Sequence, residues 1–116
     1  MNKKYILHIL IIWALFICVL SSLGCSSTKI GDILDNASQF EGKEVSIKGT
    51  VGETIWFGLL ERGGYQLGDG TGNIWIITNQ PPPEKGKSIS VKGTVKSAFS
   101  LGGQSFGTVI SESKRS

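Results

Sequence analysis

The sequence predicts an all-β fold, a small five-stranded barrel preceded by a short α-helix. Apolar and polar residues alternate from Val45 to Val51, and the same pattern returns from Ile89 to Val95. Between them, a turn separates two β-rich runs that extend from Tyr65 to Ile77. Alternation with a period of two is typical of half-buried strands, and a short glycine-rich turn between two such runs predicts a hairpin.

The first residues have the order of a signal peptide: Lys3 and Lys4, an apolar stretch over residues 5–20, and small residues before Cys25. Leu23-Gly24-Cys25 resembles the bacterial lipobox, although Ser22 and Leu23 stand in swapped order. The resemblance implies that residues 1–24 are removed and that Cys25 carries the lipid, as palmitate-type acyl chains. An uncleaved N-terminal anchor and ordinary secretion are the alternatives. Each of them places the domain outside the cytoplasm, and we expect a membrane-anchored lipoprotein of the cell envelope.

Removal of this segment changes what the composition implies. The formal charge of the whole chain is +3, but without Lys3 and Lys4 ten Lys and Arg face nine Asp and Glu. A nearly neutral domain disfavours nucleic acid as a partner, because nucleic-acid binding depends on clustered cations. The two cysteines, Cys18 and Cys25, provide no disulfide framework, and the single histidine, His8, lies in the signal. We therefore expect no metal site and no cofactor.

The remaining 92 residues are enough for one small domain. Residues 25–29 form a polar tether, residues 30–111 the domain, and residues 112–116 a flexible charged tail. Apolar residues at helical spacing predict a short helix from Asp32 to Gln39.

The strands follow the helix in order. Val45–Val51 and Ile89–Val95 are nearly the same sequence, each with a glycine inside the strand, Gly49 and Gly93, where a small barrel bends. The hairpin between them turns at Asp-Gly-Thr-Gly, residues 69–72, which we interpret as a plain turn because no Lys-Ser/Thr and no helix follow, as a phosphate loop requires. Residues 81–83 are prolines in a stiff loop, and residues 104–110 predict the fifth strand.

These segments together resemble an OB-fold, a five-stranded Greek-key barrel. The resemblance rests on residues 42–51, on the hairpin Tyr65-x-Leu67-x-Asp69-Gly70-Thr71-Gly72-x-Ile74 and on residues 86–95, and it covers nearly the whole mature chain. It is closest to tRNA-anticodon-like and other nucleic-acid-type OB domains, and looser to a periplasmic OB-fold stress family. It implies that strands one and four are neighbours. The sequence departs from the pattern in leaving no room for a helix between strands three and four, so we expect the N-terminal helix to cap the barrel instead.

The resemblance also implies a binding face on strands two and three, with the loops at residues 52–64 and 96–105. If Ile74 and Ile76 point inward, Trp75 and Ile77 point outward. The candidate ligand-binding residues are Trp56, Phe57, Arg62, Tyr65, Trp75, Lys96 and Phe99. The alternative is that the aromatic residues among them belong to the barrel core or anchor the loops.

The sequence favours a binding module over an enzyme. The mature chain has no histidine, and its acids, such as Glu53, Glu61 and Asp69, have no recognisable catalytic spacing. We therefore expect a non-catalytic OB-type binding or interaction module of the envelope, with a protein of an envelope assembly as one possible partner. The alternative is an OB domain that binds single-stranded nucleic acid or an oligosaccharide through its aromatic side chains.

Overall fold

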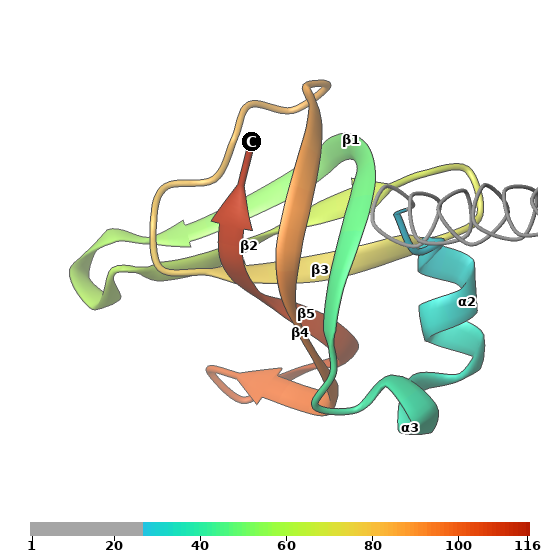
Figure 1. Cartoon of the computed structure of the whole chain (residues 1–116). Coiled ribbons are helices and arrows are strands. Elements are labelled where there is room, and N and C mark those ends of the chain that lie inside the picture. The colour runs from blue at the N-terminus through green and yellow to red at the C-terminus, as the bar shows by residue number, and fades with distance from the viewer. Residues whose placement is uncertain (1–26) are drawn as a thin grey trace, which may run out of the picture.

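The computed structural model describes residues 27–116, so the expected signal peptide and Cys25 lie outside the described residues. Five strands close a barrel in the order β1-β2-β3-β5-β4 (Figure 1). They are β1 (Glu44–Phe57), β2 (Arg62–Gly68), β3 (Asn73–Thr78), β4 (Ser88–Leu101) and β5 (Gln104–Arg115). Paired strands are antiparallel except β3 and β5, which are parallel. The predicted five-stranded barrel is confirmed, and β1 lies beside β4 as expected.

Two short helices precede the barrel where the sequence predicts one. They are α2 (Ile30–Asp35) and α3 (Ala37–Phe40), and the chain leaves the helical conformation between them at Asn36, where φ is −128°. The Asn36 side chain donates a hydrogen bond to the Asp32 carbonyl at 3.0 Å. Side-chain amides that bond to nearby backbone in this way compete with helix continuation.

The helices cap one end of the barrel, as expected. Ile30 and Ile33 are fully buried and belong to the same core cluster as the inward-facing residues of the strands. Residues 79–87 connect β3 to β4 and contain no helix, in agreement with the prolines there. The helices α2 and α3 cover the end of the barrel that lies beside the turn between β2 and β3, next to residues 27–29 (Figure 1).

The two near-identical segments pair with each other. The equivalent residues Ile47 and Val91 lie opposite one another in the β1–β4 ladder, and Gly49 lies opposite Ile89. A Cβ atom at Gly49 would lie 2.5 Å from the Gly68 carbonyl oxygen, and one at Gly93 would overlap the Ser111 carbonyl. The glycines are needed because other strands approach β1 and β4 closely at these two positions.

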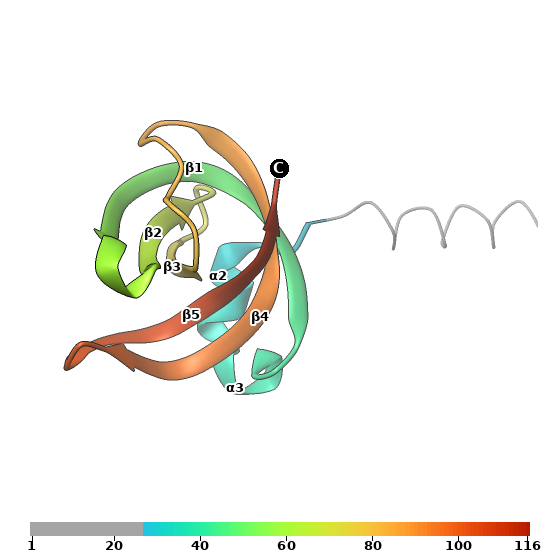
Figure 2. The same ribbon diagram turned by 90° about the vertical axis from the view of Figure 1, so that its left-hand side faces the viewer.

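The two segments that were expected to be loops, residues 52–64 and 96–105, form long hairpin arms in the structure. β1 extends to Phe57 and β2 begins at Arg62, with a 3₁₀ turn, η1 (Gly58–Leu60), at the tip, so most of the loop expected at residues 52–64 is strand. β4 and β5 likewise continue to residues 101 and 104, which reduces the loop expected at residues 96–105 to a tight turn. Figure 2 shows both arm tips projecting on the same side of the barrel.

The end of the chain also differs from the expectation. Residues 112–116 were expected to form a flexible tail, but β5 continues through Arg115, which lies opposite Val91 of β4. The Glu112 side chain is only 3% exposed and forms an ion pair with Arg115. Burial of this pair, together with ladder hydrogen bonds, gives the charged segment a fixed place in the sheet.

Candidate functional site

A narrow apolar crevice lies between the two arms. Its lining consists of side chains and glycines from all five strands: Ile55, Phe57, Gly63, Gly64, Trp75, Ile77, Leu101 and Phe106. It encloses about 10 Å³, which is about the space of a single water molecule. The crevice is thus a closely packed apolar surface rather than a pocket for a small molecule.

Trp75 is the central side chain of this surface. It is half-buried, and its ring meets Phe106 edge-to-face with centroids 5.4 Å apart and an interplanar angle of 70°. This geometry is a favourable one for aromatic pairs. Ile77 lies on the same face as Trp75, as expected, but it is only 5% exposed because Leu101 and Phe106 of the β4–β5 arm cover that end of β3.

The tip of the β1–β2 arm extends this apolar surface into solvent. Phe57 is 46% exposed, Leu60 70% and Leu59 fully exposed. The 3₁₀ turn that carries the two leucines ends at Glu61, whose φ of 48° is left-handed. We call the crevice residues together with Leu59 and Leu60 the arm face.

Apart from Tyr65, the predicted site residues divide into three groups. Phe57 and Trp75 lie on the arm face. Trp56 is adjacent to Phe57 in the same strand and does not line the crevice, since successive side chains alternate, and its ring packs against Gly63. The third group takes no part in the crevice: Arg62, Lys96 and Phe99, of which the first two are exposed and the last is half-buried.

Tyr65 is the predicted site residue that lies in the core, where it is 0% exposed. Its hydroxyl donates to Glu112 Oε1 at 2.5 Å, and Thr78 Oγ1 donates to Glu112 Oε2 at 2.6 Å. Arg115 Nη2 donates to the same Oε2 at 3.2 Å, and the Arg115 guanidinium lies over the Tyr65 ring at 5.3 Å from its centroid. The alternative that an aromatic candidate belongs to the core is therefore correct for Tyr65.

This buried cluster shifts the pKa of its acids. Burial raises the pKa of the Glu112 carboxyl, but hydrogen bonds from Thr78, Tyr65 and Arg115 and the charge of Arg115 outweigh it, so the net pKa is lowered. Burial, followed by the hydrogen bond and charge of Glu112, raises the pKa of Tyr65. Arg115 Nε lies 2.9 Å from Glu112 Oε1 yet forms no directed hydrogen bond, so that contact is an ion pair without alignment. The cluster links β2, β3 and β5 inside the barrel.

The turn between β2 and β3 holds the N-terminus of α2. Asp69 Oδ2 accepts the Ile30 N–H at 2.9 Å, and Thr71 Oγ1 accepts the Gly31 N–H at 2.9 Å. Asp69 Oδ1 accepts hydrogen bonds from the Thr71 N–H at 2.9 Å and from Thr71 Oγ1 at 2.5 Å. The plain turn predicted from the sequence is confirmed as a turn, and its side chains have a capping role that the sequence analysis did not predict.

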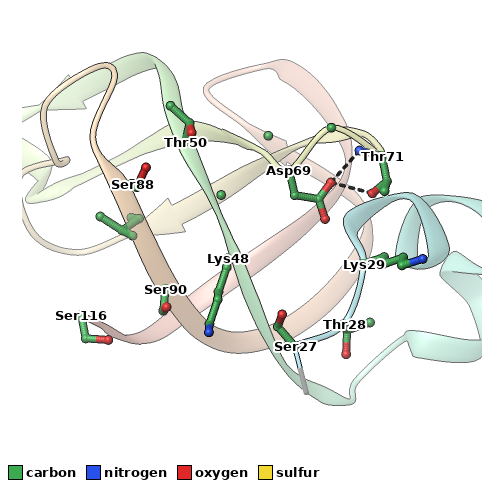
Figure 3. Close-up of a pocket in the computed structure, with 14 residues that line it drawn as sticks. Ser27, Thr28, Lys29, Lys48, Thr50, Asp69, Thr71, Ser88, Ser90 and Ser116 are labelled. Atoms are coloured by element: carbon green, nitrogen blue, oxygen red, sulfur yellow. Dashed lines mark hydrogen bonds between the residues drawn. The ribbon is translucent and has the colours of Figure 1, made fainter. Parts of the chain in front are cut away.

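A polar groove lies beside this turn (Figure 3). It has a volume of about 750 Å³ and shares no lining residue with the crevice. Its lining is rich in hydroxyl groups and carries two lysines and one carboxylate: Ser27, Thr28, Lys29, Lys48, Gly49, Thr50, Gly68, Asp69, Gly70, Thr71, Ser88, Ile89, Ser90 and Ser116. The sequence analysis did not single out this groove, because its residues come from five separate segments.

Residues 27–116 contain no group of three His, Cys, Asp or Glu side chains placed to hold a metal ion. In the same part of the chain, no helix has the length and apolar character needed to cross a membrane.

Comparison with solved structures shows the fold. Asparaginyl-tRNA synthetase from Pyrococcus horikoshii, complexed with asparaginyl-adenylate, matches with a TM-score of 0.61 and 17% identity over 79% of this chain. OBody AM3L09, bound to hen egg-white lysozyme, matches with a TM-score of 0.58 and 15% identity over 78% of this chain. A putative aspartyl-tRNA synthetase from Leishmania major Friedlin matches with a TM-score of 0.59 and 17% identity over 78%.

The domain is an OB-fold. This chain covers 22% and 20% of the two synthetase chains but 92% of the OBody. No protein-family model matches the chain, and no curated protein matches its sequence. OB-folds generally bind ligands on the face of strands two and three and on the loops that join strands one to two and four to five. The arm face occupies this position, whereas the polar groove lies outside it.

Proposed function

We propose that this chain is a non-catalytic OB-fold binding module of the cell envelope, held at a membrane by a lipid on Cys25, and that its arm face binds a protein partner. The observation that carries the proposal is the apolar crevice together with the exposed Leu59 and Leu60 at the arm tip. An exposed apolar patch of this kind is typical of an interaction site.

The chemistry of the arm face suits a protein surface better than a small ligand. The crevice is too narrow for a small molecule, while Phe57, Leu59 and Leu60 are exposed and contribute little to the domain's own core. Partly buried aromatic residues such as Trp75 often contribute most to binding at the centre of an interface. We expect a partner with an apolar patch that covers the arm tip and packs against Trp75.

The placement of the two ends supports the same proposal. The first described segment, which leads into α2, lies at the end of the barrel opposite the tip of the β1–β2 arm (Figure 1). A lipid on Cys25, two residues before Ser27, holds that end at the membrane and directs the arm face away from it. We therefore expect the arm face to bind an envelope protein and not the membrane that holds Cys25.

Single-stranded nucleic acid or an oligosaccharide is the second candidate ligand. It is supported by the OB-fold and by the aromatic pair Trp75 and Phe106, because bases and sugars stack on such rings. The near-neutral charge of residues 25–116 counts against a nucleic acid. A labelled oligonucleotide titrated at low salt tests it, and saturable binding that Trp75→Ala removes would replace the protein partner with this candidate.

The partner proposal is tested by the double substitution Leu59→Ser, Leu60→Ser in the membrane-held protein. Both side chains project into solvent, so the variant is expected to fold normally. Chemical crosslinking and pull-down are expected to recover a partner with the wild type and at least tenfold less with the variant. Leu34→Ser is the matched control, since Leu34 is 38% exposed but lies on α2. Equal recovery from the double variant and the control would remove the arm face as the binding surface.

The anchor is tested separately. Cys25→Ser is expected to abolish labelling by a palmitate analogue and to release the protein from membranes. Labelling that persists would show that Cys25 is not the acylated residue. An unlabelled wild type that stays with the membrane would favour the uncleaved N-terminal anchor.

A further inference from the structure

We infer that the polar groove binds the phosphate group of an anionic lipid headgroup, an inference that rests on the proposed lipid at Cys25. The groove is a second site, distinct from the arm face in position and in chemistry. Its lining offers hydroxyl donors and ammonium groups, which is the set that recognises a phosphate oxygen.

The floor of the groove comes from the outward side of the β1–β4 pair. Lys48 lies opposite Ser90 and Thr50 lies opposite Ser88 in the ladder, while neighbouring residues of the same strands, such as Ile47 and Ile89, are buried in the core. Alternation along both strands therefore places one ammonium group and three hydroxyls side by side on the outer surface. In Figure 3 the Lys48 side chain ends between Ser90 and Ser27.

Among the charged side chains that line the groove, Lys29 and Lys48 outnumber Asp69. Among residues 27–116, neither Lys29 nor Lys48 forms an ion pair; the pairs there join Lys92 to Glu44 and Arg115 to Glu112. Asp69 is the one acidic side chain in the lining, and both of its oxygens accept hydrogen bonds from the helix and from the turn. Burial raises the pKa of Asp69, but its hydrogen bonds outweigh burial and hold the pKa below its ordinary value. The carboxylate therefore remains ionised and hydrogen-bonded to the helix and the turn.

The groove lies close to Cys25, and this position favours a lipid headgroup over free phosphate as the ligand. Ser27 and Thr28 line the groove, and the Thr28 N–H donates to the Ser46 carbonyl at 2.8 Å, which fixes this segment against β1. Cys25 precedes Ser27 by two residues, a reach of at most about 7 Å. A lipid in the membrane at Cys25 therefore brings neighbouring headgroups to the mouth of the groove. A lysine at an anionic surface raises lipid affinity by roughly fivefold.

Hydrogen exchange of the full chain in lipid nanodiscs tests the inference. We expect slower exchange in residues 27–31 and 86–91 in discs with phosphatidylglycerol than in discs of phosphatidylcholine alone. In Lys48→Gln, the phosphatidylglycerol fraction that gives half-maximal protection is expected to rise about fivefold. Lys43→Gln is the charge-matched control, because Lys43 is exposed and does not line the groove, and it is expected to behave like the wild type.

Three results would overturn the inference. They are equal exchange in the two kinds of disc, equal effects of Lys48→Gln and Lys43→Gln, and protection by inorganic phosphate without any effect of phosphatidylglycerol. The intact mass of the same sample reports acylation independently. A mass without lipid contradicts the anchor of the proposed function, whereas lipidated protein with an unprotected groove contradicts only this inference.

Discussion

Glu112 is the side chain on which closure of the barrel most depends. It receives hydrogen bonds from Tyr65 on β2, Thr78 on β3 and Arg115 on β5, so one carboxylate joins three strands. Arg115 also donates to the Pro81 carbonyl at 3.0 Å and thereby holds the loop that leads to β4. The local sequence around residue 112 does not predict this role, because two of the partners, Tyr65 and Thr78, lie more than thirty residues away in the sequence.

Glu112→Gln is expected to destabilise the domain by about 3 kcal/mol, because it leaves Arg115 without its charge partner at a site where both side chains are largely buried. Urea unfolding followed by tryptophan fluorescence measures the change. The control is Glu53→Gln, an exposed acid on β1 whose replacement is expected to alter stability by no more than about 0.5 kcal/mol. Equal midpoints for the two variants would contradict the role given to Glu112.

The same carboxylate predicts how stability depends on pH. The pKa of Glu112 is lowered in the folded protein, so its contribution is fully present above the pKa of the unfolded chain and is lost as pH falls through the folded pKa. Unfolding free energy is expected to fall below about pH 4. Glu112→Gln is expected to lose less stability than the wild type over this range, and parallel pH profiles would contradict the assignment.

The strands that the sequence predicts best are those with strict alternation. Val45–Val51 and Ile89–Val95 were placed correctly, and their pairing explains why one sequence occurs twice. The arms were missed because glycines and polar residues at 52–64 and 96–105 carry the local signals of loops, while the cross-strand pairing that makes them strands is not local. Phe106 and Leu101 of the arm face were missed as site residues for the same reason, whereas Trp75 was found by alternation.

The β2–β3 turn caps the N-terminus of α2, and this contact between two elements can be tested by substitution. α2 has no side-chain cap of its own, and its first two N–H groups are satisfied by Asp69 and Thr71. Asp69→Ala is expected to cost about 1 kcal/mol, the usual value of a helix cap, and to speed hydrogen exchange at the amides of Ile30 and Gly31. Asp35→Ala, at the exposed end of α2, is the control, and unchanged exchange in Asp69→Ala would refute the capping role.

On the scale of the whole molecule, two unlike surfaces lie in different parts of one barrel. The arm tips project on one side, while the chain enters from the opposite end beside the polar groove (Figures 1 and 2). The barrel and its capping helix could be predicted from periodicity and from the OB-fold resemblance. The groove could not, since it forms only where residues 27–29, the β2–β3 turn and the β1–β4 pair meet.

Site-specific photocrosslinking in cells tests the central claim most directly. A photoreactive amino acid at position 60, at the arm tip, is expected to give a discrete crosslinked protein product, whereas the same amino acid at position 34 on α2 gives none. Trp75→Ala in the position-60 protein is expected to reduce that product at least fivefold, because Trp75 is the central side chain of the arm face. The same product from position 34, or none from position 60 in membrane-held protein, would contradict an arm face that binds a protein.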